Sequence, residues 1–216
     1  MRLTRQRSAG AGRGVHWKPA RAAEASRWAA VLGLVVASLL GACSGGKTSS
    51  TQPSAKPKEV SPSGDIPDTQ AYLSFVPAGG AFSVKVPEGW ARSESGSTTR
   101  FTDKLNSVRI EARPAPSAPT TDSATKDEVP AIKASEPHVA VDGVSEVSRP
   151  AGAAVLVKYH ADAKPDPVTG KSSRLAVERY EFWRTGREVV LTLSGPAGSD
   201  NIDPWKVITT SFRWNS

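Results

Sequence analysis

Hydrophobic and polar residues alternate along much of the chain from about Tyr72 onward. Phe82, Val84 and Val86, for example, are separated by Ser83 and Lys85. A period of two residues is the pattern of a strand with one buried face. The same pattern recurs four more times. It predicts strands at residues 82–86, 108–113, 155–160, 173–183 and 188–194.

The last three of these strands are predicted to form an antiparallel meander over residues 152–195. Thr185-Gly186-Arg187 is short enough to be a hairpin turn between the final two strands. Residues 164–171 contain two prolines and form the longer loop before them. The charged residues of this hairpin alternate with apolar ones, and Glu178 and Glu181 are predicted to lie on opposite faces of their strand.

Helical signals are fewer. Asp203 followed by Pro204 fits an N-cap with proline at the first helical position, and apolar residues at 205, 208 and 212 then share one face. Phe212 and Trp214 can already belong to an extended tail. Residues 121–135 carry a weaker helical pattern, which Pro130 interrupts. Many antiparallel strands with a few covering helices predict an α+β fold.

The first 42 residues carry a different pattern. A basic segment precedes thirteen uncharged residues, 28–40, which are too few to span a bilayer in comfort. They match the apolar part of a secretory signal, and Leu40-Gly41-Ala42-Cys43 has the form of a bacterial lipobox. We therefore expect residues 1–42 to be a lipoprotein signal peptide. The alternatives are an ordinary signal peptide that happens to contain a cysteine, or an uncleaved anchor.

Cleavage before Cys43 would make this residue the new N-terminus, with its thiol carrying a diacylglyceryl group. Two acyl chains give stable membrane attachment, whereas one gives only marginal binding. The expected location is the outer face of the cell membrane, reached through the lipid on Cys43.

A linker is expected between the anchor and the domain. Residues 43–69 are rich in serine, proline and glycine and hold few sizeable apolar residues, so they predict a disordered tether. Its 26 residues after Cys43 would reach roughly 25–30 Å. Residues 70–216 are then the folded domain.

Composition narrows the functional classes. Most of the net charge of +7 comes from the leader, because residues 43–216 hold 21 basic and 20 acidic residues and so carry only +1. A nearly neutral domain argues against nucleic acid as a partner. Cys43 is the single cysteine, so an internal disulfide and a cysteine-based zinc site are excluded. The glycine-rich segments 77–80 and 194–198 lack the lysine and helix of a phosphate loop, so no cofactor is predicted.

The segment 82–90, FSVKVPEGW, resembles the opening of PsbP-like domains, in which a strand runs into Pro-x-Gly-Trp. The strand count, the closing helix and the terminal Ser-Phe-Arg-Trp are similar to that family as well. The resemblance covers roughly residues 70–216 and is greatest to secreted actinobacterial lipoproteins. It implies an α-β-α sandwich around an antiparallel sheet, and accessory or binding roles without a catalytic signature. Pro87, Gly89 and Trp90 themselves are expected to form a turn and a core plug.

The sequence after the leader contains few of the residue patterns that catalyse reactions. His138 and His160 are the histidines after the leader, and both are expected to be solvated or at a strand edge. No Gly-x-Ser-x-Gly elbow presents a serine nucleophile. Four tryptophans could line an apolar cavity, although such residues more often fill cores. They are Trp90, Trp183, Trp205 and Trp214.

Four arginines crowd the hairpin and could meet an anionic surface, but we expect them to form a charged solvent face with the neighbouring glutamates. They are Arg174, Arg179, Arg184 and Arg187. The sequence thus favours a non-catalytic binding or accessory lipoprotein with an unknown protein or small-molecule partner. The alternatives are a carrier of an apolar or amphiphilic small molecule and, less favoured, a cell-wall hydrolase.

The first prediction concerns the anchor. Replacing the thiol in Cys43→Ser should abolish labelling by radioactive palmitate, because no other cysteine can carry the lipid. The protein should then appear in the medium or remain unprocessed. Unchanged labelling would contradict the lipobox interpretation.

Overall fold

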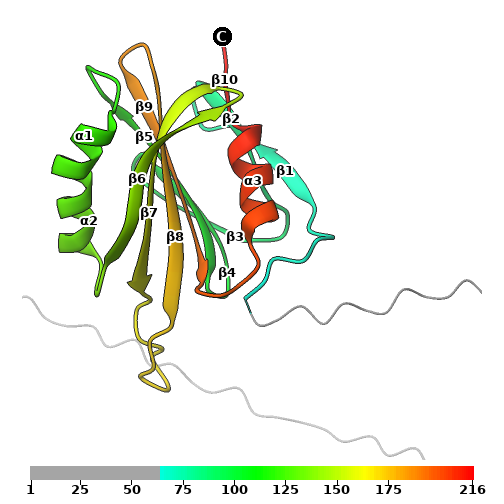
Figure 1. Cartoon of the computed structure of the whole chain (residues 1–216). Coiled ribbons are helices and arrows are strands. Elements are labelled where there is room, and N and C mark those ends of the chain that lie inside the picture. Colours follow the sequence, from blue (N-terminus) through cyan, green and yellow to red (C-terminus); the bar gives the residue numbers. More distant parts are fainter. Residues whose placement is uncertain (1–63) are drawn as a thin grey trace, which may run out of the picture. The chain divides into compact units, whose positions relative to one another are not determined.

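The computed structural model describes residues 64–216 (Figure 1). The predicted signal peptide 1–42, the lipobox residues Leu40, Gly41 and Ala42, the lipidation site Cys43 and the tether up to residue 63 lie outside the described residues. None of the helices in residues 64–216 is long and apolar enough to cross a membrane.

Within residues 64–216, seven strands form one antiparallel sheet in the order β3-β4-β5-β9-β8-β7-β6 (Figure 1). The strands are β3 (Ala91–Ser95), β4 (Thr98–Asp103), β5 (Asn106–Pro114), β6 (Ala140–Arg149), β7 (Gly152–Asp162), β8 (Arg174–Arg184) and β9 (Arg187–Pro196). β3 to β5 and β6 to β9 are two meanders, and the pairing of β5 with β9 joins them into one sheet.

A second layer covers one face of this sheet. It consists of a small sheet, β1 (Tyr72–Phe75), β2 (Phe82–Pro87) and β10 (Arg213–Trp214), together with helix α3 (Ile202–Ser211). Phe212 is fully buried here and stacks on Phe182 of β8 with ring centroids 4.4 Å apart. Ile208 of α3 and Leu191 of β9 are fully buried in the same cluster. This apolar layer is the main core.

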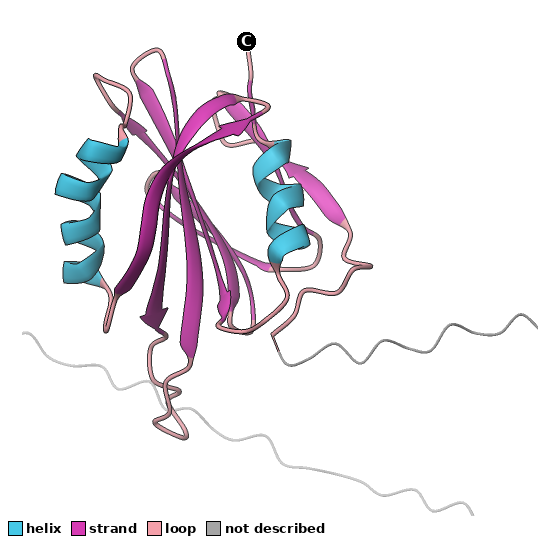
Figure 2. Cartoon of the chain, in the orientation of Figure 1, coloured by secondary structure: helices cyan, strands magenta, loops and turns pink. Residues whose placement is uncertain are grey.

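The opposite face is covered by a helical segment, as the two groups of helices in Figure 2 show. The segment consists of α1 (Thr121–Ser123), a π-helical turn (Ala124–Glu128) and α2 (Val129–Ser135). Ala124 and Ile132 pack on Val157 and Tyr159 of β7 in a smaller apolar cluster. The π turn precedes Pro130 and lets Val129 N–H donate to the Ala124 carbonyl, five residues back. The predicted interruption at Pro130 is thus a local widening within one helical segment, because proline lacks an N–H and its ring crowds an ordinary α turn.

The α+β prediction is confirmed, and so are the five predicted strands, the Thr185-Gly186 hairpin and the closing helix. The prediction of one sheet between helices is incomplete, because β1, β2 and β10 form a separate sheet beside α3. Pro87 is buried, Gly89 has a φ of +82° and Trp90 packs against the main core, as expected for a turn followed by a plug.

The packed part of the chain begins before residue 70. Ile66 is buried, and its N–H donates to the side-chain oxygen of Asn201. Asn106 donates to the carbonyl of Gly64, and the Asn106 and Asn201 side chains bond to each other. Gly195 of β9 is required there, since a Cβ would lie 2.5 Å from the Asn106 side chain. Residues 64–69, which the sequence placed in the tether, therefore belong to the folded part.

The second prediction tests the core with two isoleucines of one helix. Ile208 of α3 is fully buried, whereas Ile202 is 76% exposed. Ile208→Ala should lower the free energy of unfolding by about 2–5 kcal/mol, because it leaves a cavity. The matched Ile202→Ala change should alter it by less than about 0.5 kcal/mol. Urea denaturation checks both values. Equal losses would contradict the assignment of the main core to this face of α3.

Candidate functional site

Neither histidine of the domain is placed to activate a nucleophile. The His138 ring bonds to the Asp162 carboxylate at 2.7 Å, and His138 is exposed in the loop after α2. The His160 ring lies 2.9 Å from the Asp142 carboxylate at the β6–β7 edge. Within residues 64–216 no group of three or more His, Cys, Asp or Glu side chains is arranged to hold a metal ion. The structure thus gives both histidines access to solvent, as the sequence favoured, although His138 lies in a loop and His160 on β7, next to the edge strand β6.

The four tryptophans do not gather around one cavity. Trp205 is buried in the main core, and Trp90 and Trp214 pack partly buried against it. Trp183 lies on the other face of the large sheet and donates its indole N–H to the Ala115 carbonyl at 2.9 Å. The tryptophans are packing residues, as tryptophans more often are. The structure therefore shows no tryptophan-lined pocket among residues 64–216 to support the carrier hypothesis.

The charged hairpin of β8 and β9 is buried in part, and the prediction of a uniform solvent face is wrong. Arg184 and Arg187 are exposed as expected, but Arg179, Glu181 and Glu188 are 6%, 1% and 4% exposed. The helical segment covers them. Glu178 and Glu181 do lie on opposite faces of β8, since Glu178 pairs with Lys158 at 2.7 Å and Glu181 faces the helical segment.

An ionic cluster fastens the helical segment to the sheet. Glu128, the last residue of the π turn, accepts hydrogen bonds from Arg113 of β5 at 2.6 Å and from Arg179 of β8 at 2.7 Å. Arg113 also bonds to Glu188 at 2.5 Å, and Arg179 bonds to Glu181 at 3.2 Å. Two guanidinium groups thus bond to three carboxyl groups. With all five groups ionised, the cluster would carry one negative charge in excess.

Glu181 is the carboxyl group of this cluster whose pKa is raised. Burial raises the pKa of Glu181 to about 7; the Arg179 charge opposes this shift, and the nearby carboxylates of Glu128 and Glu188 reinforce it. Burial tends to raise the pKa of Glu128 as well. The charge of Arg179 and the hydrogen bond and charge of Arg113 outweigh this effect, so the pKa of Glu128 lies below its usual value. Glu181 is therefore the member of the cluster that titrates near neutral pH.

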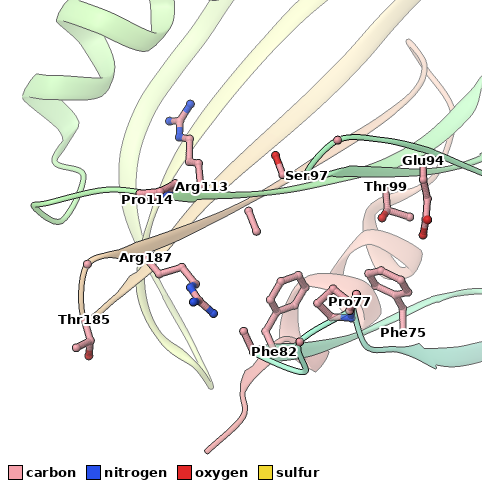
Figure 3. A pocket seen from close by; sticks show the side chains of 16 residues that line it. Phe75, Pro77, Phe82, Glu94, Ser97, Thr99, Arg113, Pro114, Thr185 and Arg187 are labelled. Carbon is pink, nitrogen blue, oxygen red and sulfur yellow. The ribbon is translucent and has the colours of Figure 1, made fainter.

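An open cleft of about 580 Å³, the turn-end cleft, lies where several turns meet at one end of the large sheet (Figure 3). The β1–β2 connection enters it at Pro77, the β3–β4 turn at Gly96 and the β8–β9 hairpin at Thr185-Gly186. Gly96 and Gly186 have φ values of +57° and +77°, which glycine adopts without the cost that a Cβ adds. The cleft volume is in the range of small-ligand sites.

The turn-end cleft has an apolar floor and a polar rim. Phe75 and Phe82 line it from β1 and β2, and Ala112 lines it from β5. Figure 3 shows Arg187 directed toward Phe82, whereas the Arg113 side chain points away, to the ionic cluster. Glu94 on the rim forms an ion pair with Arg92, and Arg187 has no ion-pair partner among residues 64–216.

The rim offers hydroxyl groups from Ser97, Thr99 and Thr185, but no histidine or cysteine lines the cleft. The sequence marked the glycines as turns and gave no sign that these turns converge, because Phe75 and Arg187 are more than a hundred residues apart. Of the predicted candidates, only Arg187 lies in the cleft.

Comparison with known proteins identifies the fold. No family model matches the chain, and no curated protein matches it. The solved structure of the cyanobacterial PsbP protein CyanoP from Synechocystis is similar at a TM-score of 0.51 and 12% identity, over 68% of this chain and 94% of that one. The domain therefore has a PsbP-like α+β fold, and this likeness shows the fold alone.

Two further structures are more distant. A Bacteroides thetaiotaomicron protein has a TM-score of 0.46 and 14% identity over 66% of this chain, and the chain spans about half of its length, 48%. LpqN of Mycobacterium tuberculosis, a protein involved in cell envelope biogenesis, has a TM-score of 0.40 and 14% identity over 69% of this chain and 93% of that one.

The third prediction follows from the raised pKa of Glu181. The folded chain holds this proton more tightly than the unfolded chain, whose carboxyl has the usual value of 4.5. The stability that this proton contributes is present below pH 4.5 and is lost as the pH rises through about 7. Glu181→Gln cannot ionise, so at about pH 8 it should be more stable than the parent by about 1–3 kcal/mol.

Urea denaturation at about pH 4.5 and about pH 8 checks this expectation. Glu178→Gln is the matched control, because it changes a carboxyl on the opposite face of β8. The control should not gain stability at about pH 8, because it removes a carboxylate that pairs with Lys158. A Glu181→Gln variant that loses stability at about pH 8 would contradict the assignment of the excess charge to this residue.

Proposed function

We propose that the protein is a non-catalytic binding module on the outer face of the cell membrane, anchored by a lipid on Cys43, and that it binds its partner in the turn-end cleft. The lipobox at residues 40–43 supports the anchor. The binding role rests on one observation, which is where the cleft lies relative to Gly64, the first described residue on the side of Cys43.

These two points lie at opposite ends of the large sheet. Gly64, where the described chain begins, contacts Asn106 at the start of β5 and Pro196 at the end of β9. The cleft is lined by Pro114 at the end of β5 and Arg187 at the start of β9. Strands of this length, at about 3.3 Å per residue, separate the two points by about 25–30 Å.

A tether that joins the domain at Gly64 would therefore attach at the end of the sheet opposite the cleft and leave the cleft free to face away from the membrane. The 21 residues from Cys43 to Gly64 would add about 25 Å of reach as a flexible chain. Such a placement favours an extracytoplasmic partner over the lipid surface beneath the domain.

The cleft chemistry favours a partner segment that combines an apolar side chain with an acidic group. Pro77, Ala78 and Ala81 offer apolar surface above the buried Phe75 and Phe82. Arg187 offers a guanidinium without an ion-pair partner among residues 64–216. A carrier of an amphiphilic small molecule is the second candidate, favoured by the same phenylalanine floor. A hydrolase has no comparable support, since His138 and His160 pair with aspartates far from this rim.

The fourth prediction locates the binding face. A photo-crosslinking amino acid at Thr185, on the cleft rim, should give an adduct with a defined partner in intact cells. The same group at Val168, which is 91% exposed in the β7–β8 loop, should not. Val168 is the control because its loop follows β7 at the opposite end of the sheet.

Blocking the cleft supplies the second half of this experiment. Ala78→Glu places a charge in the exposed part of the cleft and should reduce the Thr185 adduct about tenfold, because a charge must be desolvated against the apolar floor. Ala197→Glu, a matched change in an exposed turn at the opposite end, should leave the adduct unchanged. Equal adducts from Thr185 and Val168, or equal losses in the two glutamate variants, would contradict the proposal.

A further inference from the structure

A second open cleft, the sheet-face cleft, lies on the face of the large sheet that carries α2. Its volume is about 640 Å³, and it runs from α2 across the exposed surfaces of β4, β5, β9 and β8. Ile132 and Ser135 of α2 form part of its wall. It shares no lining residue with the turn-end cleft, and its chemistry is polar.

One row of side chains crosses the floor of this cleft. Arg100 of β4 is paired in register with Arg109 of β5, and Arg109 with Thr192 of β9. Thr192 is paired in turn with Arg179 of β8. Neighbouring strands are about 4.8 Å apart, so Arg109 and Arg179 are the residues that flank Thr192, one on the strand to either side.

Thr192 is the unusual member of this row. Its hydroxyl oxygen is buried and has no hydrogen-bond partner within the described residues. Buried hydroxyl groups are normally hydrogen-bonded, and an unpartnered one requires an explanation. Ser107 and Ser194, in the next row of the cleft, bond to each other at 2.8 Å, so the lack of a partner is specific to Thr192.

The carboxylates that line the cleft already have partners. Glu111 pairs with Arg109, Glu128 with Arg113 and Arg179, and Asp162 with Arg174. Glu136 accepts a hydrogen bond from Tyr159 at 3.0 Å.

The unused hydrogen-bonding capacity therefore belongs to donors. A guanidinium has five N–H donors, and Arg109 uses one nitrogen in an ion pair among residues 64–216. Arg100 and Lys164 line the cleft, and neither has an ion-pair partner in the same part of the chain.

We propose that the sheet-face cleft binds a small hydrophilic ligand through an oxyanion, a phosphate or a carboxylate, held over Thr192 between Arg109 and Arg179. Arg109 would donate to the oxyanion from one side in the forked geometry that guanidinium groups form with such groups. Arg179 would donate from the other side through Nη1, the nitrogen that its bonds to Glu128 and Glu181 leave unused. The Thr192 hydroxyl would donate from below. Ser107 and Ser194 would meet the polar remainder of the ligand, which the volume of the cleft accommodates.

The proposal is independent of partner binding at the turn-end cleft. The two clefts lie on different faces of β5, since Ala112 faces one and Arg109 the other. Either site can therefore be tested without the other.

The fifth prediction is a titration of the isotope-labelled full-length chain in detergent, followed by nuclear magnetic resonance. The probes are inorganic phosphate, glycerol phosphate and succinate at equal ionic strength. At least one should shift the amide signals of Arg109, Thr192 and Arg179 in a saturable way, with a dissociation constant of about 1 mM or lower. The tightest of the three probes identifies the source as free phosphate, a phosphate ester such as a lipid headgroup, or a carboxylate.

Two variants and one control make the titration specific. Arg109→Gln should raise the dissociation constant at least about tenfold, because it removes a charge-assisted contact. Arg92→Gln is matched, since Arg92 in β3 also pairs with a glutamate two residues later, but its guanidinium lies over the Phe75 ring on the other face. It should leave the dissociation constant unchanged.

Thr192→Val separates binding from folding. The variant keeps the shape and removes a hydroxyl that has no partner in the free protein, so thermal stability should be equal or higher. Its dissociation constant should still rise about threefold to tenfold. The absence of saturable shifts with all three probes would overturn the proposal. An equal loss in Arg92→Gln, or unchanged binding in Thr192→Val, would overturn it as well.

Discussion

Strand β5 pairs with β9 although about eighty residues separate them in the chain, and the register of this pair determines both clefts. It places Arg109 opposite Thr192 and Pro114 opposite Arg187. A slip of one residue would turn Val108 and Ile110 out of the main core and Arg109 into it. The cost of burying a guanidinium among apolar residues is therefore what specifies the positions of both candidate sites.

The two faces of the large sheet are held by different forces. On the α3 side, burial of aromatic and aliphatic residues such as Phe182, Leu191 and Phe212 supplies a non-directional driving force. On the α2 side, the directional bonds of Arg113 and Arg179 to Glu128 supplement a small apolar cluster. Buried ion pairs contribute little net stability but are costly to break, so the cluster fixes where the helical segment lies more than it stabilises the domain.

The sequence predicts the elements whose two faces differ in polarity. β2, β5 and β9 alternate because one face meets the main core, and the closing helix is marked by Asp203-Pro204 and its apolar spacing. It misses β3, whose five residues are all exposed, and β6, an edge strand without a fully buried residue. Such strands are held by pairing with a neighbour, and backbone pairing leaves no hydrophobic period in the sequence.

The sequence pattern does not predict the two clefts either, for a related reason. A period of two shows that Arg179 and Glu181 share a face, but not that a helix fifty residues upstream covers it. The resemblance at residues 82–90 correctly indicates the fold, because a proline turn and a tryptophan plug are packing features. The turn-end cleft, by contrast, is lined by turns such as Gly96 and Thr185-Gly186, whose side chains contribute little to the core.

Residues of that kind can change without loss of the fold, and ligand specificity can change with them. This is why a likeness to CyanoP at 12% identity gives the architecture and leaves the ligand open. Groups whose hydrogen bonds or ion pairs are incomplete within the described chain are the ones that point to a ligand. Thr192 and Arg187 are such groups among residues 64–216, one on each cleft, and each is held in place by the pairing of β9 with β5.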